Sequence, residues 1–322
     1  MEDLEKYSYS KLDTYMQCPF KYKLVYIDKK NIYTDSVATL IGTLVHATEE
    51  NIAKLIQKNE PIDYIKLKNN FIIKIAEIEK KFYKDYWTPD KNGVLYKDKI
   101  YFYLDKGIYR LEKFMKEHPT YKIVGIEQEF LFDYETAKVK KCKFKGFIDR
   151  VFYDTATDKY IIQDIKTYAE PISDEKLTTP LQFVFYTLAA DNLWGAKENQ
   201  IICQYDLPFL DLTQDAGTKG YMTRGKAKLE KLFGSIDNKD FKPNPTPLCH
   251  WCIFCQTNPN QPEAAKHLCP YYSHWTRENK TFKTENEWQG MENHKLVLEH
   301  YLKSHNVSQI EGGELNGKSS SN

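Results

Sequence analysis

Apolar residues recur with two different periods along this chain, and the change of period predicts its architecture. Five segments carry apolar residues three to four positions apart and are predicted to be helical: residues 38–58, 63–87, 98–118, 177–193 and 222–233. Three segments alternate like antiparallel strands, and a fourth strand is expected after them: residues 123–132, 142–153, 160–167 and 200–207. This order predicts an α/β core with a mixed sheet inside a helical shell.

Both ends of the chain have a less regular pattern. Ser8 to Leu12 open like an N-capped helix, which Cys18-Pro19 interrupts. A proline-rich passage then leads into a cysteine cluster near the other end. We predict five parts: residues 1–37 (helical, with one cluster cysteine), 38–210 (core, with a helical insertion at 60–120), 211–275 (cysteine region), 276–305 (C-terminal helix) and 306–322 (a tail expected to be disordered).

Composition and charge exclude several classes of protein. The chain has 322 residues, of which 41% are apolar, and it contains no run of about 18 apolar residues that would span a membrane. Its acidic, polar start argues against a signal peptide, so we expect a cytoplasmic protein. Abundant Lys, Asn, Ile and Tyr are typical of an AT-rich genome such as a phage or a low-GC bacterium, and for a phage the location is the host cytoplasm. The 46 basic and 45 acidic residues give a net charge of +1, so the chain has no overall basic field, and any nucleic-acid contact must come from a local patch.

The most informative chemistry lies in the predicted hairpin of residues 142–167. Centring its polar turn between Ala156 and Thr157 places Asp149 directly opposite Asp164, and the alternation puts Lys166 on the same face. Two facing carboxylates repel each other, and a divalent cation relieves that repulsion. Hard oxygen ligands suit Mg²⁺ or Mn²⁺. We therefore predict a metal site on this hairpin.

Asp-x-Lys by itself is a weak signal, because the chain contains four other copies that read as solvated charge pairs. The copy at Asp164 differs in its setting, since it ends an apolar strand and faces another carboxylate. Such a site can hydrolyse a phosphodiester: the metal polarises the phosphate and activates water, while an ammonium group orients that water or offsets the growing charge.

In the order of its motifs the chain resembles the RecB-like branch of the PD-(D/E)XK nuclease superfamily. Five segments carry the resemblance: Ser8-Tyr9-Ser10-x-Leu12 with Cys18-Pro19, Gly42-x-x-x-His46, Gly146-x-x-Asp149, Asp164-x-Lys166-Thr167 and Gln182-x-x-x-Tyr186. The resemblance implies a restriction-endonuclease-like αβββαβ core with a mixed sheet, a helical insertion and a C-terminal cysteine segment. It also implies a Mg²⁺- or Mn²⁺-dependent deoxyribonuclease.

The same resemblance implies roles for individual residues. His46, Asp149, Asp164 and the Ile165 carbonyl would bind the metal, and Lys166 would assist the attacking water. Gln182 and Tyr186 would contact a DNA phosphate. Without the resemblance, His46 reads as a hydrogen-bonded core histidine beside Gly42, and the pair on the later helix as ordinary helix packing.

Two further features are weaker. Glu127 and Glu129 share a face of the first strand, and only Glu127 aligns with a family acid, whose role can be functional or merely structural. A basic run enters the catalytic hairpin and is either a solvated edge or a grip on backbone phosphates: Lys138, Lys140, Lys141, Lys143 and Lys145.

The cysteines predict a second metal site. Seven cysteines, partly clustered, fit metal ligation better than a disulfide framework, because thiols at Cys-x-x-Cys spacing can reach one metal. Iron–sulfur-containing AddB-type and CRISPR-adaptation nucleases resemble the chain here, which implies a 4Fe-4S cluster held by four cysteines: Cys18, Cys249, Cys252 and Cys269. Cys142 and Cys203 fall in strands and are expected to be buried thiols.

Two alternatives for this second site stay open. Cys255 lies in a longer insert than the family has, and it can replace Cys269 as the fourth ligand. A local zinc site is the other alternative, formed by Cys249, Cys252, Cys255 and Cys269 or by one of them with His250 or His267.

Taken together, the residues and the resemblance predict a DNA exonuclease or end-processing nuclease of recombination or repair. A helicase or recombination protein is the expected kind of partner, and no membrane is involved. The first alternative is a nuclease-like module that binds DNA ends or a partner without cutting. The second is a redox protein, which leaves the Asp–Asp–Lys hairpin unexplained.

Overall fold

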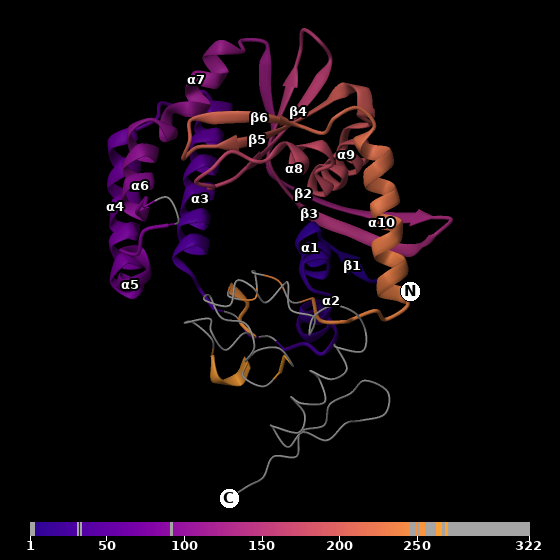
Figure 1. Ribbon diagram of the computed structural model, residues 1–322. Helices are drawn as coiled ribbons and strands as arrows, with labels where there is room; N and C mark the ends of the chain where they lie inside the picture. Colours follow the sequence, from indigo (N-terminus) through magenta and orange to yellow (C-terminus); the bar gives the residue numbers. More distant parts are fainter. Residues whose placement is uncertain are drawn as a thin grey trace, which may run out of the picture. The chain divides into compact units, whose positions relative to one another are not determined.

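The computed structural model describes residues 4–30, 32, 34–90, 93–244, 246, 249, 251–254, 262–265 and 268–269 (Figure 1). The chain separates into two units. One comprises residues 1–9 and 35–234, and the other comprises residues 10–34 and 235–322. The expected helix at 276–305 and the tail at 306–322 lie outside the described residues.

A six-stranded mixed sheet forms the centre of the first unit. Its strands are β1 (Lys6–Tyr7), β2 (Tyr121–Thr136), β3 (Val139–Asp154), β4 (Lys159–Ile165), β5 (Ile201–Leu207) and β6 (Leu212–Ala216). They are ordered β1-β3-β4-β5-β6, with β2 also paired to β3. β1 runs parallel to β3 and β4 runs parallel to β5, whereas the other pairs are antiparallel. The predicted α/β fold with a mixed sheet is confirmed.

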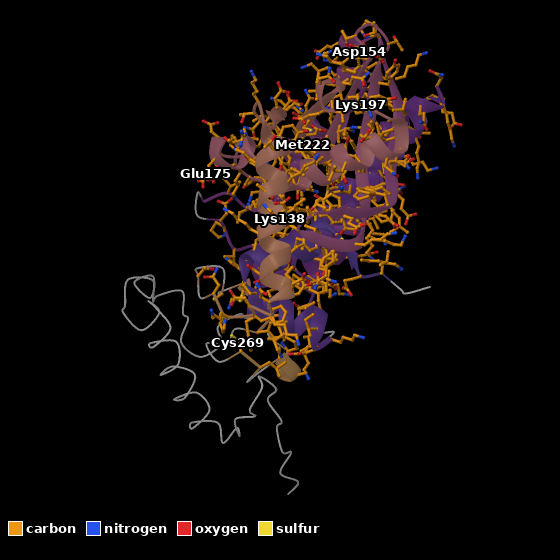
Figure 2. All side chains as sticks on the ribbon, turned by 90° about the vertical axis from the view of Figure 1, so that its right-hand side faces the viewer. Lys138, Asp154, Glu175, Lys197, Met222 and Cys269 are labelled. Atoms are coloured by element: carbon orange, nitrogen blue, oxygen red, sulfur yellow. The ribbon has the colours of Figure 1, made fainter. Side chains whose placement is uncertain are left out.

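The β3–β4 hairpin has the predicted register. Arg150 pairs with Gln163 and Asp154 pairs with Lys159. One further step along both strands brings Asp149 level with Asp164, as the turn chemistry predicted. Asp154 lies near the turn of this hairpin (Figure 2).

The strand β3 forks the sheet. β1 pairs with its residues 143–144, and β4 pairs with its residues 150–154. Between residues 144 and 150 of β3, β2 is the only described strand that pairs with it. Asp149 lies at this fork, where the other edge of β3 is open to side chains from neighbouring elements.

Helices α3 to α9 and most of α10 belong to the same unit as the sheet, whereas α2 and nearly all of α1 belong to the second unit (Figure 1). The helix bounds are α1 (Tyr9–Gln17), α2 (Pro19–Tyr22), α3 (Val37–Gln57), α4 (Tyr64–Lys81), α5 (Tyr83–Tyr86), α6 (Tyr96–Asp105), α7 (Arg110–Glu117), α8 (Asp174–Thr178), α9 (Leu181–Trp194) and α10 (Tyr221–Asp237). A π-helical turn (Lys23–Ile27) and three 3₁₀ turns (Gly107–Tyr109, Glu198–Gln200 and Glu263–Ala265) complete the described elements.

Two hydrophobic interfaces hold the helices on the sheet. The apolar stripe of α3 packs with α4, α6 and α7 against Phe152, Ile161 and Ile165. In the other interface, Phe144 of β3 stacks on Phe185 of α9, with ring centroids 4.2 Å apart, and lies 6.1 Å from Phe233 of α10. The residues that carry α3 and α9 onto the sheet therefore also place the polar side chains of both helices.

Three predicted helices are interrupted, each for a local reason. Residues 63–87 divide at Phe82, whose φ of −128° and ψ of 42° leave the helical region. Residues 98–118 divide at Gly107, where a Cβ would lie 2.4 Å from the Pro208 carbonyl oxygen. Residues 177–193 divide before α9, because Pro180 disfavours helical backbone at Thr179.

The strands also differ from prediction. β2 and β3 each span 16 residues and are longer than the periodicity indicated. β1 and β6 carry too few alternating residues to be recognised. No helix among the described residues has the length and apolarity needed to cross a membrane.

Candidate active site

Asp149 is the centre of the candidate site. Its Oδ2 accepts a hydrogen bond of 2.7 Å from the Ile165 N–H, which ties β3 to the end of β4. Burial raises the pKa of Asp149 well above its ordinary value, and the facing charge of Asp164 raises it further. A buried acid whose pKa is raised by burial and by a facing carboxylate is typical of a site that gains a cation.

Three potential metal ligands converge at the fork. His46 of α3, Glu127 of β2 and Asp149 of β3 each offer an atom, and these atoms lie within 4.8 Å of one another. His46 Nδ1 is 3.6 Å from Asp149 Oδ2. Burial lowers the pKa of His46, although the charge of Asp164 opposes this, so the imidazole favours the neutral form that binds metals. One nitrogen and two carboxylates are a suitable donor set for a divalent metal.

Glu127 is the site residue that the sequence undervalued. It offers a carboxylate oxygen beside the two predicted ligands His46 and Asp149. Its φ of 43° is in the left-handed region, which a residue with a Cβ rarely adopts and which costs free energy. The signal in the sequence was its alignment with a family acid, and in the structure the pairing of β2 with β3 places it level with Asp149.

Asp164 lies beside this group and is held by a separate set of partners. Its Oδ1 accepts hydrogen bonds from Gln182 Nε2 at 2.7 Å and from the Tyr186 hydroxyl at 3.1 Å. Its Oδ2 is buried and has no hydrogen-bond partner of regular geometry among the described residues, although the Lys166 ammonium lies 2.6 Å away. A buried carboxylate oxygen that is short of partners fits a site in which a metal completes the coordination.

Lys166 joins the acids, as the alternation predicted. Burial alone would lower the pKa of Lys166, yet the charges of Asp164 and Asp149 hold it above the ordinary value. The group therefore remains an ammonium. Its Nζ also donates to Gln182 Oε1 at 3.1 Å, so the amide of Gln182 contacts both members of the Asp-x-Lys motif.

The structure places Gln182 and Tyr186 on the carboxylate of Asp164. They lie one turn apart on α9, and Gln182 Nε2 is 2.7 Å from the Tyr186 hydroxyl. Only 4% of Tyr186 is exposed, so its hydroxyl orients Asp164. The contact of these two residues with a DNA phosphate stays a prediction.

The basic run of β3 largely behaves as a solvated edge. Lys141 and Lys143 both pair with Asp133, at 3.1 and 2.7 Å. Lys138 pairs with Glu230 of α10 at 3.1 Å (Figure 2). Lys145 is exposed and forms no ion pair within the part of the chain that the structure describes. The contact of this run with backbone phosphates stays a prediction.

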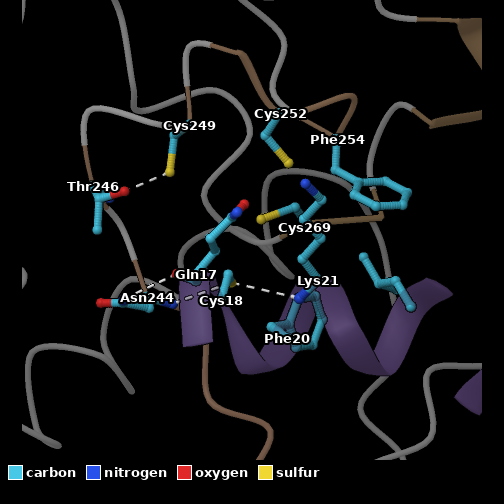
Figure 3. Close-up of a pocket in the computed structure, with 11 residues that line it drawn as sticks. Gln17, Cys18, Phe20, Lys21, Asn244, Thr246, Cys249, Cys252, Phe254 and Cys269 are labelled. Atoms are coloured by element: carbon cyan, nitrogen blue, oxygen red, sulfur yellow. Dashed lines mark hydrogen bonds between the residues drawn. The ribbon is translucent and has the colours of Figure 1, made fainter. Parts of the chain in front are cut away.

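The second unit contains the cysteine pocket. Cys18, Cys249, Cys252 and Cys269 line it together with Phe20 and Phe254 (Figure 3). This convergence brings together the four cysteines that the resemblance selected, from both ends of the sequence. Cys255, His250 and His267, which belong to the alternative ligand sets, lie outside the described residues.

Backbone N–H groups point at two of these sulfurs. Cys18 Sγ accepts from the N–H groups of Lys21 and Asn244, at 3.5 and 3.4 Å. Cys249 Sγ accepts from the Thr246 N–H at 3.4 Å. These bonds fix the positions of both sulfurs relative to the backbone of the second unit.

The remaining two described cysteines have the predicted setting. Cys142 and Cys203 are buried in β3 and β5. Burial raises the pKa of Cys203 to about 12, so this thiol stays protonated and is unsuited to metal binding.

Comparison with known proteins identifies the class to which this fold and site belong. The sequence profile of the PD-(D/E)XK nuclease superfamily matches residues 6–256. The chain therefore belongs to the PD-(D/E)XK nuclease superfamily, as the motifs predicted, while its RecB-like branch stays a prediction.

A search of solved structures gives a distant likeness. A structure titled "Crystal structure of SSO0001" is 16% identical, covers 76% of this chain and 95% of that chain, and has a TM-score of 0.28. A TM-score this low does not indicate a shared fold. Comparison with curated proteins gives no match.

Proposed function

We propose that this protein is a metal-dependent deoxyribonuclease that hydrolyses phosphodiester bonds at DNA ends. One observation carries the proposal: a histidine and two carboxylates converge within 4.8 Å beside a lysine that is 2.6 Å from a further carboxylate. Ligands for a divalent metal and a cation for the reacting phosphate are thus present together.

His46, Glu127 and Asp149 would hold the metal, and the donor set fits Mg²⁺ or Mn²⁺. Asp164 and the Ile165 carbonyl are the further ligands that the sequence predicted. The metal would polarise the phosphate and lower the pKa of a bound water. The histidine nitrogen makes Mn²⁺ the stronger candidate, since imidazole suits softer divalent ions than Mg²⁺.

The residues of the chain supply the other parts of the mechanism. The Lys166 ammonium orients the attacking water or stabilises charge that develops on the phosphate. Gln182 keeps Lys166 and Asp164 in place, because its amide oxygen accepts from one and its amide nitrogen donates to the other. The Ile165 N–H orients Asp149 by its bond to Oδ2.

We further propose an exonuclease of recombination or repair, acting with a helicase or recombination protein in the cytoplasm. The resemblance of the motif order to RecB-like nucleases supports this part. A phage origin is supported by the AT-rich type of composition, and the location is then the host cytoplasm.

The cysteine pocket would hold a 4Fe-4S cluster. Its four cysteines fit the group in number, and two sulfurs accept backbone N–H donors. A local zinc site built from the clustered cysteines is the alternative occupant. The cluster would link the two chain segments of the second unit.

Cleavage of labelled single- and double-stranded DNA in Mn²⁺ tests the enzymatic proposal. Lys166→Ala and Asp149→Asn should each abolish cleavage while the far-ultraviolet circular dichroism stays unchanged. Asp174→Asn and Lys176→Ala are matched controls, since they alter another Asp-x-Lys motif that is exposed on α8, and both should cut normally. Persistent cleavage by Lys166→Ala would reject the assignment. Tight DNA binding without cleavage by the unaltered protein would favour the non-cutting alternative.

A further inference from the structure

A buried polar network centred on Arg150 adjoins the active site. Only 2% of the Arg150 side chain is exposed. Its Nη2 lies 2.6 Å from Asp206 Oδ2, and its Nη1 lies 3.4 Å from Glu49 Oε2. Its Nε and Nη2 also donate to Gln163 Oε1, at 3.0 and 2.8 Å. The guanidinium thus binds three side chains from three different elements.

Two members of this network are sequence neighbours of strand residues in the active site. Arg150 directly follows Asp149 in β3, and Gln163 directly precedes Asp164 in β4. Their bonds hold these two strands in register at the point where the carboxylates face each other.

The other two members connect the remaining site residues. Glu49 follows His46 by three positions on α3, and therefore by about one helical turn. Asp206 of β5 accepts the backbone N–H of Lys166 at 2.8 Å through its own carbonyl oxygen. Arg150 is therefore tied directly to α3, which carries His46, and to β4, which carries Asp164. It is tied to Lys166 through Asp206 and one backbone bond.

The helical insertion joins the same network. The Tyr103 hydroxyl of α6 donates to Glu49 Oε1 at 2.9 Å. Arg110 of α7 donates through Nε and Nη2 to Asp206 Oδ1, at 3.1 and 2.7 Å. Both carboxylates that hold Arg150 thus have a second partner in the insertion.

The network is a poor source of stability, which points to another role. Taking charged groups out of water costs several kcal/mol per ion, and their attraction often only offsets that cost. Burial raises the pKa of Glu49 to about 7 even though Arg150 lowers it, so desolvation outweighs the pairing. What these directional bonds provide is a fixed geometry.

We propose that Glu49 and Arg150 are positioning residues that set the distance of His46 from the carboxylates of β3 and β4. This inference rests on the proposed metal-dependent function and deepens it. One imidazole nitrogen on α3 has to lie beside carboxylates on two strands, and the position of a metal ligand tolerates errors of about 0.5 Å. A slip of one residue along the helix moves a side chain by about 1.5 Å and rotates it by about 100°. The bond from Glu49 to Arg150 prevents this slip one turn away from His46.

Mn²⁺ affinity of the full-length protein tests the proposal, measured by titration calorimetry without DNA. Glu49→Ala removes the link between α3 and Arg150, and we expect Mn²⁺ to bind about 10–100-fold more weakly, as for other residues that orient metal ligands. Glu49→Gln keeps an oxygen for Arg150 and a polar group for Tyr103, so it should stay within about 3-fold of the unaltered protein. If Glu49 acted only through its charge, Glu49→Gln would weaken Mn²⁺ binding as well.

Asp154→Asn is the matched control. Asp154 is a buried carboxylate in the same hairpin, five residues beyond Asp149, and it bonds to Thr120 and to the Ala156 N–H. Its loss should lower the thermal midpoint without changing the Mn²⁺ affinity. Cleavage by Glu49→Ala should recover at saturating Mn²⁺, because the ligands themselves remain.

The outcomes separate this proposal from the function on which it rests. Normal Mn²⁺ affinity in Glu49→Ala would overturn the positioning role and leave the nuclease assignment intact. If the unaltered protein binds no Mn²⁺, both fail. If Glu49→Ala does not fold, Tyr103→Phe replaces it, because it removes one hydrogen bond from Glu49 and changes little volume. We expect this variant to bind Mn²⁺ several-fold more weakly, and an unchanged affinity would overturn the proposal.

Discussion

The candidate active site, or carboxylate site (His46, Glu127, Asp149, Asp164 and Lys166), and the cysteine pocket differ in how their side chains are held. In the carboxylate site, Asp164 of β4, Lys166 directly after β4, and the Gln182 and Tyr186 side chains of α9 contact one another at 2.6–3.1 Å, and Asp164 is 99% shielded from solvent. In the cysteine pocket, the cysteines are only half-buried, and the hydrogen bonds described at their sulfurs come from backbone N–H groups at 3.4–3.5 Å.

This difference indicates how each site would depend on the metal proposed for it. Bonds between the surrounding side chains already hold the carboxylate site, so metal binding there should change the fold little. The cysteine pocket connects two distant segments through thiols, and a metal bound to all four would hold these segments together. Removing metal should therefore affect chemistry in the first site and folding in the second.

The strongest way to break this contrast is to remove the ammonium group of the first site. Lys166→Ala should lower the cleavage rate by at least 10²–10³-fold, roughly the effect of losing one preorganised charge stabiliser. The thermal midpoint should change little, because Asp164 keeps its bonds to Gln182 and Tyr186. Single-turnover cleavage and thermal melting measure the two effects. A large loss of stability would show that the site is not held independently of Lys166.

A second change tests Glu127 as a ligand. Glu127→Gln should weaken Mn²⁺ binding by at least about 10-fold, since the group donates a carboxylate oxygen to the site. Glu129→Gln is the control, because Glu129 is exposed two residues further along β2 and should leave binding unchanged. Calorimetric titration of both variants decides, and equal affinities would remove Glu127 from the metal site.

Removing metal from the second unit tests the other half of the contrast. After treatment with an iron chelator, the protein should lose visible absorption, and protease should cut residues 10–34 and 235–269 several-fold faster. Cleavage within residues 35–234 should stay slow, and removal of Mn²⁺ alone should leave the whole pattern unchanged. Mass spectrometry of the fragments locates the cuts. Protection that survives complete loss of iron would contradict a structural role for the metal.

The smallest expected effect concerns the buried network beside the site. The Glu49 pKa rises from 4.5 to about 7 on folding, so its protonated form stabilises the folded state below about pH 4.5, and this contribution is lost as the pH rises through about 7. Glu49→Gln cannot lose a proton. The difference in free energy of unfolding, Glu49→Gln minus the unaltered protein, should therefore be larger at pH 8 than at pH 5 by on the order of 2 kcal/mol. Urea unfolding at both pH values measures the change, and a constant difference would contradict the shifted pKa.

Several features followed from the sequence because their causes are local. The alternation of β3 and β4, with a polar turn between them, sufficed to predict that Asp149 faces Asp164. The spacing of Gln182 and Tyr186 predicted a shared helix face. The four cysteines of the pocket were selected by resemblance from both ends of the chain, and they line one pocket.

Other features are absent from any local pattern. Arg150 reads as a charged residue after an acid, and its burial between α3 and β5 depends on elements about 100 residues before it and 56 residues after it. The left-handed backbone of Glu127 and the fork of β3 between β1 and β4 likewise depend on distant pairings.

The sequence alone determined which side chains share a strand or helix face, because backbone geometry sets those periods wherever the element lies. Only the tertiary structure decided which faces meet. That choice depends on burial and strand pairing, and it brings Glu127 beside His46 and Asp149 and surrounds Arg150 with carboxylates.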